Sequence, residues 1–155
     1  MSVELLNKDT VVKYLTDKKV ISASDNAEVE VLTGGVSNVV LAITTANQKL
    51  VLKQALAELA VSEKWLADQR RAIVEADAIK LFNQLSPDQV PKLIFLDPER
   101  FILVLERVPV GSTVWKSDLL AGVINPDVGA GLGKTLATWH NYGEVTASAK
   151  IKFME

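Results

Sequence analysis

Cysteine is absent from this sequence, and histidine occurs only once, at position 140. Without thiols the chain can form neither disulfides nor thiolate metal sites, and a single imidazole makes a histidine-based metal centre implausible. The 17 basic and 19 acidic residues nearly balance, and the basic residues form no long run. That balance argues against nucleic acid as the main partner.

Long apolar runs are also lacking. No stretch approaches the length needed to cross a bilayer, and the opening MSVELLNKDT lacks the basic and then apolar segment of a secretory signal. We therefore expect a cytoplasmic protein without membrane partners. The length fits one ordinary domain, or one lobe of a larger one, and 48% apolar residues can bury a core.

The pattern that remains predicts an α+β protein. Asn7 can cap a first helix that runs through Val11 and Leu15 at helical spacing. Strands are expected at 28–33, 37–45, 48–54, 92–96 and 101–105, and further helices at 61–85, 115–120 and 125–140. This order predicts a five-stranded antiparallel sheet with helices on one side, including one long flanking helix.

Two glycines separate the first two predicted strands. Gly34 and Gly35 let the backbone turn sharply and approach an anion, and the small polar residues Ser37 and Asn38 follow them. Hydrogen bonds from such residues suit phosphate oxygens. Taken alone, the glycine pair is more typical of an ordinary hairpin turn.

Lys53 and Glu75 are the candidate charged pair. Strand alternation places Lys53 on one face of the third strand together with Val51, and a lysine there can neutralise phosphates. Glu75 borders the apolar stripe of the long helix, so it points toward the sheet and needs a cation. Lys53 is the obvious one. The alternatives are an ordinary solvated lysine, and a glutamate paired with Arg71 or Lys80 one helical turn away.

The fifth strand leads into an extended segment at 106–111. Its exposed backbone groups suit the edge of an adenine ring, although the segment alone is equally typical of a plain linker. A P-loop-like string at 129–135 is rejected, because Val128 stands where that motif needs its first glycine and the spacing of Leu132 and Leu136 is helical. His140, near a helix end, is expected to pack or cap.

The order of these features, and their wording, resembles the aminoglycoside phosphotransferase family, a broad group that includes methylthioribose, choline and homoserine kinases. The stretches that carry the resemblance are GGVSNVVLAI, LVLKQ, Arg71-x-x-x-Glu75, LVLERVPVG and LGKTLATWH, between about residues 28 and 140. The turn differs from that of protein kinases, which has three spaced glycines. The resemblance implies a kinase-like N-terminal lobe at 1–109, and a linker with the first helices of a C-terminal lobe at 110–155.

The resemblance also implies a role for each candidate residue in binding ATP. Gly34, Gly35, Ser37 and Asn38 would cover the phosphates. Lys53 would contact the α- and β-phosphates and pair with Glu75. The adenine ring would pack on Val40 and Val51, with its edge bound by the backbone of Glu106 and Val108.

Catalytic and Mg²⁺-binding residues of this family lie beyond the helix that ends near His140. Residues 141–155 hold only two acids, Glu144 and Glu155, so no catalytic residue or metal ligand can be assigned. We expect a fragment or truncated product, inactive by itself. The intact protein would transfer the ATP γ-phosphate to a hydroxyl of a sugar, aminoglycoside or amino alcohol. The alternative is a non-catalytic module that binds nucleotide or protein, and the C-terminal helix is a candidate homo-oligomer contact.

Overall fold

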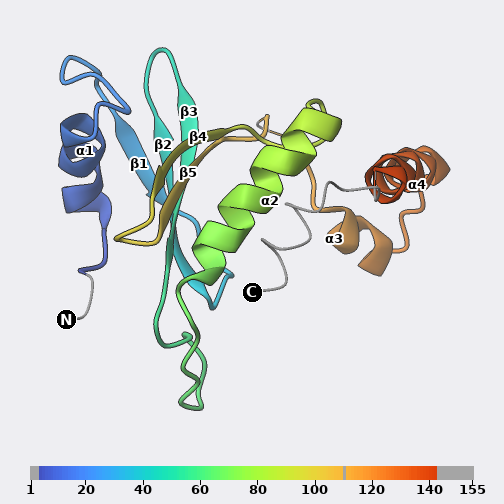
Figure 1. Ribbon diagram of the computed structural model, residues 1–155, viewed down its shortest axis with the longest axis horizontal. Helices are drawn as coiled ribbons and strands as arrows, with labels where there is room; N and C mark the ends of the chain where they lie inside the picture. Colours follow the sequence, from blue (N-terminus) through green and yellow to red (C-terminus); the bar gives the residue numbers. More distant parts are fainter. Residues whose placement is uncertain (1–3, 110, 143–155) are drawn as a thin grey trace. The chain divides into compact units, whose positions relative to one another are not determined.

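A computed structural model describes residues 4–109 and 111–142 of the chain (Figure 1). It confirms an α+β architecture with one five-stranded antiparallel sheet. Along the described residues, no helix combines the length and the apolar character required to cross a membrane. The elements are, in order, α1 (Lys8–Asp17), β1 (Glu28–Val31), β2 (Asn38–Thr44), β3 (Lys49–Ala55), α2 (Arg71–Leu85), β4 (Leu93–Asp97), β5 (Ile102–Glu106), α3 (Trp115–Leu120) and α4 (Pro126–Asn141).

The described residues divide into two compact units. The first contains the residues up to Lys80 together with Pro91–Arg107, and so holds α1, the sheet and most of α2. The second contains Leu81–Val90 and the residues from Val108 on. The functional division after residue 109 stays a prediction.

The sheet has the strand order β1-β2-β3-β5-β4, and all of its neighbours are antiparallel. The strands β2 and β5 are almost continuously apolar, and because successive side chains point to opposite faces, both faces of the sheet carry apolar residues. On one face, Leu41, Leu52 and Val104 are fully buried and pack with Val11 and Leu15 of α1. This cluster is the main core of the first unit.

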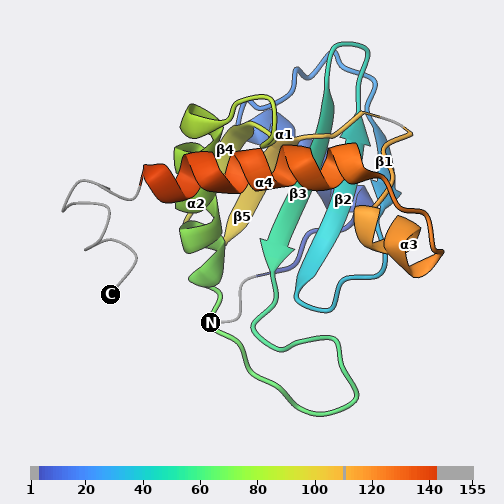
Figure 2. The ribbon, with the colours of Figure 1, turned by 90° about the vertical axis from the view of Figure 1, so that its right-hand side faces the viewer.

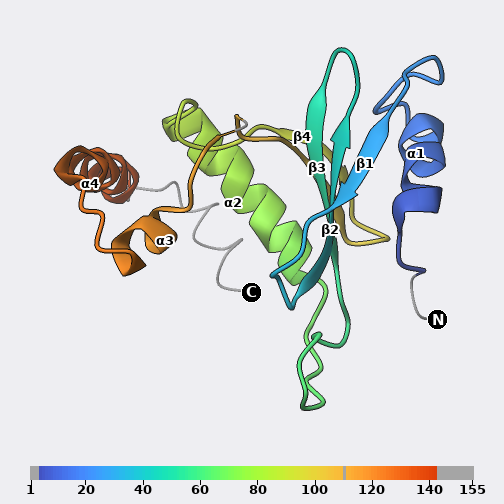
Figure 3. The ribbon, with the colours of Figure 1, turned by 180° about the vertical axis from the view of Figure 1, so that it is seen from behind.

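The opposite face is covered by α2. Leu103 of β5 and Ala55 of β3 pack there against Ala72 and Ala76 of the helix. The expectation of helices on one side is therefore wrong, because α1 and α2 lie on opposite faces of the sheet (Figures 1 and 3). A continuous apolar run indicates that both faces of a strand are buried, but it does not show which helix covers which face.

The long helix begins later than expected. The predicted span 61–85 is wrong in its first ten residues, because α2 starts at Arg71. The Leu59 amide donates to the Trp65 carbonyl and the Ala67 amide to the Ala57 carbonyl, so the preceding residues form a bridged loop (Figure 2). The Asp68 carboxylate then accepts from the Arg70 amide at 2.8 Å, a turn that introduces the helix.

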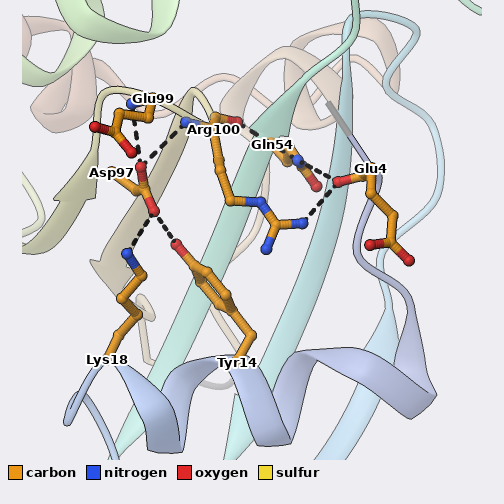
Figure 4. Close-up of polar contacts among 7 residues, drawn as sticks. All are labelled: Glu4, Tyr14, Lys18, Gln54, Asp97, Glu99 and Arg100. Carbon is orange, nitrogen blue, oxygen red and sulfur yellow. Dashed lines mark hydrogen bonds and ion pairs between the residues drawn. The ribbon is translucent and has the colours of Figure 1, made fainter. Parts of the chain in front are cut away.

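The first helix is fixed at its start and along one side. Asn7 Oδ1 accepts from the amides of Asp9 and Thr10, and the Thr10 hydroxyl accepts from the Asn7 amide. This reciprocal capping box confirms the predicted cap. On the side that faces the sheet, Tyr14 of α1 and its C-cap residue Lys18 take part in a polar network (Figure 4).

Asp97, at the end of β4, is the centre of that network and is only 4% exposed. It accepts from the Tyr14 hydroxyl at 2.8 Å and pairs with Lys18 at 3.1 Å. Its other oxygen accepts from the amides of Glu99 and Arg100, each at 3.1 Å, which shapes the β4–β5 turn. The turn lies one residue later than expected, because β4 extends to Asp97 and Phe101 takes a left-handed φ of 53° before β5 begins.

Gln54 on β3 fastens the segment that precedes α1. Its side chain is fully buried, and its Oε1 accepts from the Leu6 amide at 2.8 Å. Its Nε2 donates to the Glu4 carbonyl at 3.1 Å (Figure 4). Arg100 donates to the same carbonyl at 2.8 Å. Residues 4–6, which precede α1, are thereby part of the packed structure.

The second unit is organised around Trp139 of α4. Its ring stacks on Phe82 with centroids 4.1 Å apart, and its Nε1 donates to the Ser86 hydroxyl at 3.1 Å. Asn125 caps α4 by accepting from the Asp127 amide, as predicted. Many of the apolar side chains in this unit are exposed, namely Val108, Val114, Leu119, Leu120, Val123, Ile124, Val128, Leu132 and Leu136.

Candidate functional site

The face of the sheet that α2 partly covers carries the predicted lysine. Lys53 pairs in register with Val40 of β2 and with Leu103 of β5. Strand alternation therefore puts Val40, Val51 and Lys53 on the same face. Both valines are partly buried and the lysine side chain is 24% exposed, so an apolar surface lies beside one accessible ammonium group.

Glu75 reaches this lysine from α2. Lys53 Nζ donates to Glu75 Oε1, which confirms the predicted ion pair. Of the two alternatives, Lys80 pairs with Asp77 at 3.6 Å and Arg71 binds backbone carbonyls. The Glu75 side chain is 36% exposed, so both charges of the pair can be reached by solvent or by a ligand.

The glycine turn between β1 and β2 has one position that requires glycine. Gly34 adopts a φ of 103°, a conformation that other residues rarely take. At Gly35 no positive φ occurs, and a side chain would meet no atom within 4 Å. At the end of the turn, Asn38 Nδ2 donates to the Ser37 hydroxyl at 3.0 Å. The hydroxyl proton of Ser37 is therefore left to donate elsewhere.

Arg71 was not among the predicted site residues. It is the first residue of α2, and its guanidinium group donates to the carbonyl of Ser37 at 2.6 Å and to that of Leu56 at 2.8 Å. The sequence carried a partial signal, since Arg71 precedes Glu75 by one helical turn. Its partners are backbone carbonyls, however, and these leave no trace in the side-chain pattern.

The predicted adenine contacts fall at the end of β5. The Glu106 amide donates to the Lys92 carbonyl at 2.9 Å, so only its carbonyl is left for an adenine edge. Leu105, just before it, is buried on the same sheet face as Lys53. Val108 belongs to the second unit and its side chain is 58% exposed. The adenine role of both residues stays a prediction.

Neither of the other sequence features forms a site in the described residues. The glycine-rich string at 129–135 lies inside α4, which confirms that it is no phosphate-binding loop. His140 lies in the last turn of the same helix. Across residues 4–109 and 111–142, no three acidic or histidine side chains gather where they could hold a metal ion.

A five-stranded antiparallel sheet, a long helix on one face and a lysine–glutamate pair between them define a kinase-like N-terminal lobe. Comparison with known proteins narrows this class. No family model matches the chain. Curated proteins that match it include methylthioribose kinases, and this similarity supports a small-molecule kinase-like protein.

The similarity covers most of this chain but only a minor part of each relative. The methylthioribose kinase of Bacillus cereus is 29% identical over 133 residues, which are 85% of this chain and 34% of that protein. That of an Enterobacter species is 31% identical over 117 residues, 74% of this chain and 29% of that protein. That of Citrobacter koseri is 32% identical over 95 residues, 61% and 24% of the two chains. This chain thus spans a quarter to a third of the length of these relatives.

Proposed function

We propose that this chain is the ATP-binding lobe of a small-molecule kinase that transfers the γ-phosphate of ATP to a hydroxyl group of a sugar. The Lys53–Glu75 ion pair, on the same sheet face as Val40 and Val51, carries the proposal. The similarity to methylthioribose kinases favours a sugar over the aminoglycoside and amino alcohol acceptors. The division into an ATP-binding lobe at 1–109 and the start of a second lobe at 110–155 is part of this proposal.

The residues present fit a nucleotide. Val40 and Val51 offer an apolar, partly buried surface on which a flat purine can pack. Lys53 supplies a positive charge, and its ion pair with Glu75 fixes the orientation of the lysine side chain. An ammonium group fixed in this way suits the α- and β-phosphates. Gly34 allows the backbone to approach the phosphates, and the free proton of the Ser37 hydroxyl can be donated to a phosphate oxygen.

The bound nucleotide would supply the phosphoryl group, and the task of this lobe is to bind and orient it. Phosphoryl transfer depends mainly on positioning and on charge stabilisation at the phosphates. Lys53 contributes to both, because it is tethered by Glu75 and still accessible. Mg²⁺ normally accompanies ATP, but no metal ligands are assigned among the described residues.

Nucleotide affinity is the direct test of this proposal. We expect measurable binding of ADP or ATP by calorimetry, and Lys53→Met should weaken it about ten-fold or more through loss of a charge-assisted contact. Lys49→Met is the matched control, since Lys49 lies on the same strand and is exposed. Equal affinities for the wild type and Lys53→Met, or no binding by either, would contradict the proposed role.

A second prediction concerns turnover. Because the chain spans a quarter to a third of the length of its relatives, we expect the purified 155-residue chain to show no ATP-dependent phosphorylation of methylthioribose or of other sugars. A coupled assay for ADP release measures this, with a full-length methylthioribose kinase as the positive control. Sustained turnover by this chain would mean that it carries catalytic groups we have not assigned.

A further inference from the structure

The guanidinium group of Arg71 joins three separate segments of the first unit. Its Nη2 donates to the Ser37 carbonyl at the end of the glycine turn and to the Leu56 carbonyl just after β3. Its Nη1 donates to the Asp68 carbonyl at 2.8 Å, in the turn before α2. One side chain thus ties the start of β2, the end of β3 and the start of α2 together.

The position of Arg71 is unfavourable for the helix itself. The N-terminal end of a helix carries partial positive charge, so a cation in the first turn is destabilising. The first turn of α2 contains no acidic residue, and within the described ranges no carboxylate forms an ion pair with Arg71. The contacts that compensate for this placement are those to the carbonyls. Arg71 therefore stabilises the junction of these three segments, namely the end of the glycine turn, the end of β3 and the start of α2, and does not stabilise the helix itself.

The junction is reinforced by backbone hydrogen bonds. The Ser37 carbonyl also accepts from the Leu56 amide at 3.0 Å, and the Val36 carbonyl accepts from the Ala60 amide at 2.8 Å. Gln69, two residues before Arg71, donates to the Ala55 carbonyl at 2.7 Å. The end of the glycine turn is consequently fixed to the loop that leads into α2.

Arg71 and Glu75 are one helical turn apart and lie on the same side of α2. Arg71 binds the end of the glycine turn and Glu75 binds Lys53, so α2 contacts both of the elements that are proposed to bind phosphates. We propose that Arg71 is a positioning residue that couples the glycine turn to the Lys53–Glu75 ion pair. Its relevance to the nucleotide rests on the proposed function, whereas the coupling is a property of the chain alone.

Coupling between two sites is reciprocal. A nucleotide that orders the glycine turn would also hold α2, and with it Glu75, against the sheet. In the other direction, loss of the Lys53–Glu75 pair would loosen the end of the glycine turn. Arg71 is the connection in both directions, because the other bonds of the junction end in the loop before the helix.

The coupling can be tested without nucleotide by amide exchange measured by NMR. The Leu56 and Ala60 amides report on the junction. We compare the wild type, Arg71→Lys, Glu75→Gln and the double variant. Lysine keeps the charge of Arg71 but lacks its planar fork of donors. Glu75→Gln should speed exchange at both amides about five-fold in the wild-type background and by less than about two-fold with Arg71→Lys.

A control amide and a second Arg71 variant accompany this experiment. The Glu106 amide, which donates to Lys92 away from the junction, should exchange equally in all four proteins. Arg71→Gln is measured in parallel, so that the result does not depend on the folding of one variant. A Glu75→Gln effect of the same size in both backgrounds, or none in the wild type, would overturn the coupling.

Nucleotide titration then tests the role in binding. In the wild type, ADP should shift the amide resonances of Gly34 and Gly35 and slow exchange in the first turns of α2. Arg71→Lys should weaken ADP binding about ten-fold and abolish the slowing in α2. If Arg71→Lys binds ADP with the affinity of the wild type, and ADP slows exchange in α2 of the variant equally, the positioning role is wrong. If the wild type binds no nucleotide, the proposed function is wrong, and the nucleotide-free experiment alone judges the coupling.

Discussion

At the scale of single residues, Asp97 shows how a buried charge is accommodated. Burial opposes its ionisation, but hydrogen bonds from Tyr14, Lys18 and the Arg100 amide outweigh this and hold the pKa of the carboxyl below its usual value. Burial, together with the bond to Asp97, raises the pKa of the Tyr14 hydroxyl well above its ordinary value. The tyrosine therefore stays a hydrogen-bond donor throughout the neutral range.

The lowered pKa of Asp97 makes its contribution to stability depend on pH. The free energy of unfolding should gain from Asp97 above about pH 4 to 5, and lose that gain as the pH falls through the folded-state pKa. Asp97→Asn should therefore cost about 1–3 kcal/mol at neutral pH and progressively less in acid. Urea denaturation at several pH values measures this. The carboxylate Asp17, exposed on α1, is the control as Asp17→Asn. A constant cost across the pH range would contradict the account.

The two glycines of the turn, adjacent in sequence, should respond differently to alanine. At Gly34 the φ of 103° strains any other residue, so Gly34→Ala should lower the free energy of unfolding by about 1–3 kcal/mol. Gly35→Ala, with no positive φ and open space at its Cβ, should change it by less than about 0.5 kcal/mol. Thermal denaturation of both variants decides the matter. Similar costs at both positions would show that the turn conformation is not what restricts Gly34.

At the scale of elements, the sequence was informative where a signal is local. Asn7 and Asn125 cap the helices they were expected to cap, and Ser86 follows the residue at which α2 ends. Composition predicts the start of α2 ten residues too early, because 61–70 lacks glycine and proline and is rich in helix formers. What overrides that propensity is a bridge between Glu58 and Leu66, which composition cannot reveal.

The same distinction holds for the candidate site. The Lys53–Glu75 pair could be predicted because strand alternation and helix spacing each give a side chain a direction. The contacts of Arg71 could not be predicted, because they depend on how β3 and the glycine turn approach α2 in space. Tyr14 and Asp97 are 83 residues apart, and no periodic pattern links them.

At the scale of the whole molecule, many large apolar side chains of the second unit are exposed to solvent. Leu132 and Leu136 of α4 are 43% and 39% exposed, and Leu120 and Ile124 nearly 80%. Apolar patches of this kind usually find a partner. We expect the chain to self-associate through α4, whose glycines at 129, 131 and 133 each lower its intrinsic helicity by about 1 kcal/mol relative to alanine.

Light scattering over a dilution series tests this expectation. Leu136→Glu should shift the protein toward monomer, because it places a charge in the apolar contact. Ala137→Glu is the matched control, since it adds the same charge to the same helix but about 100° further around its axis. A wild-type monomer at all concentrations, or equal effects of the two variants, would count against a contact through α4.

The hydrogen bonds of Gln54 have a practical consequence for anyone who engineers this protein. Residues 4–6 look like a dispensable leader, yet Leu6 is 5% exposed and its amide satisfies a carboxamide buried in the middle of the sheet. Trimming the chain to the first helix would leave that carboxamide without two of its partners and open a void beside it. An affinity tag is therefore best placed so that residues 4–6 are kept.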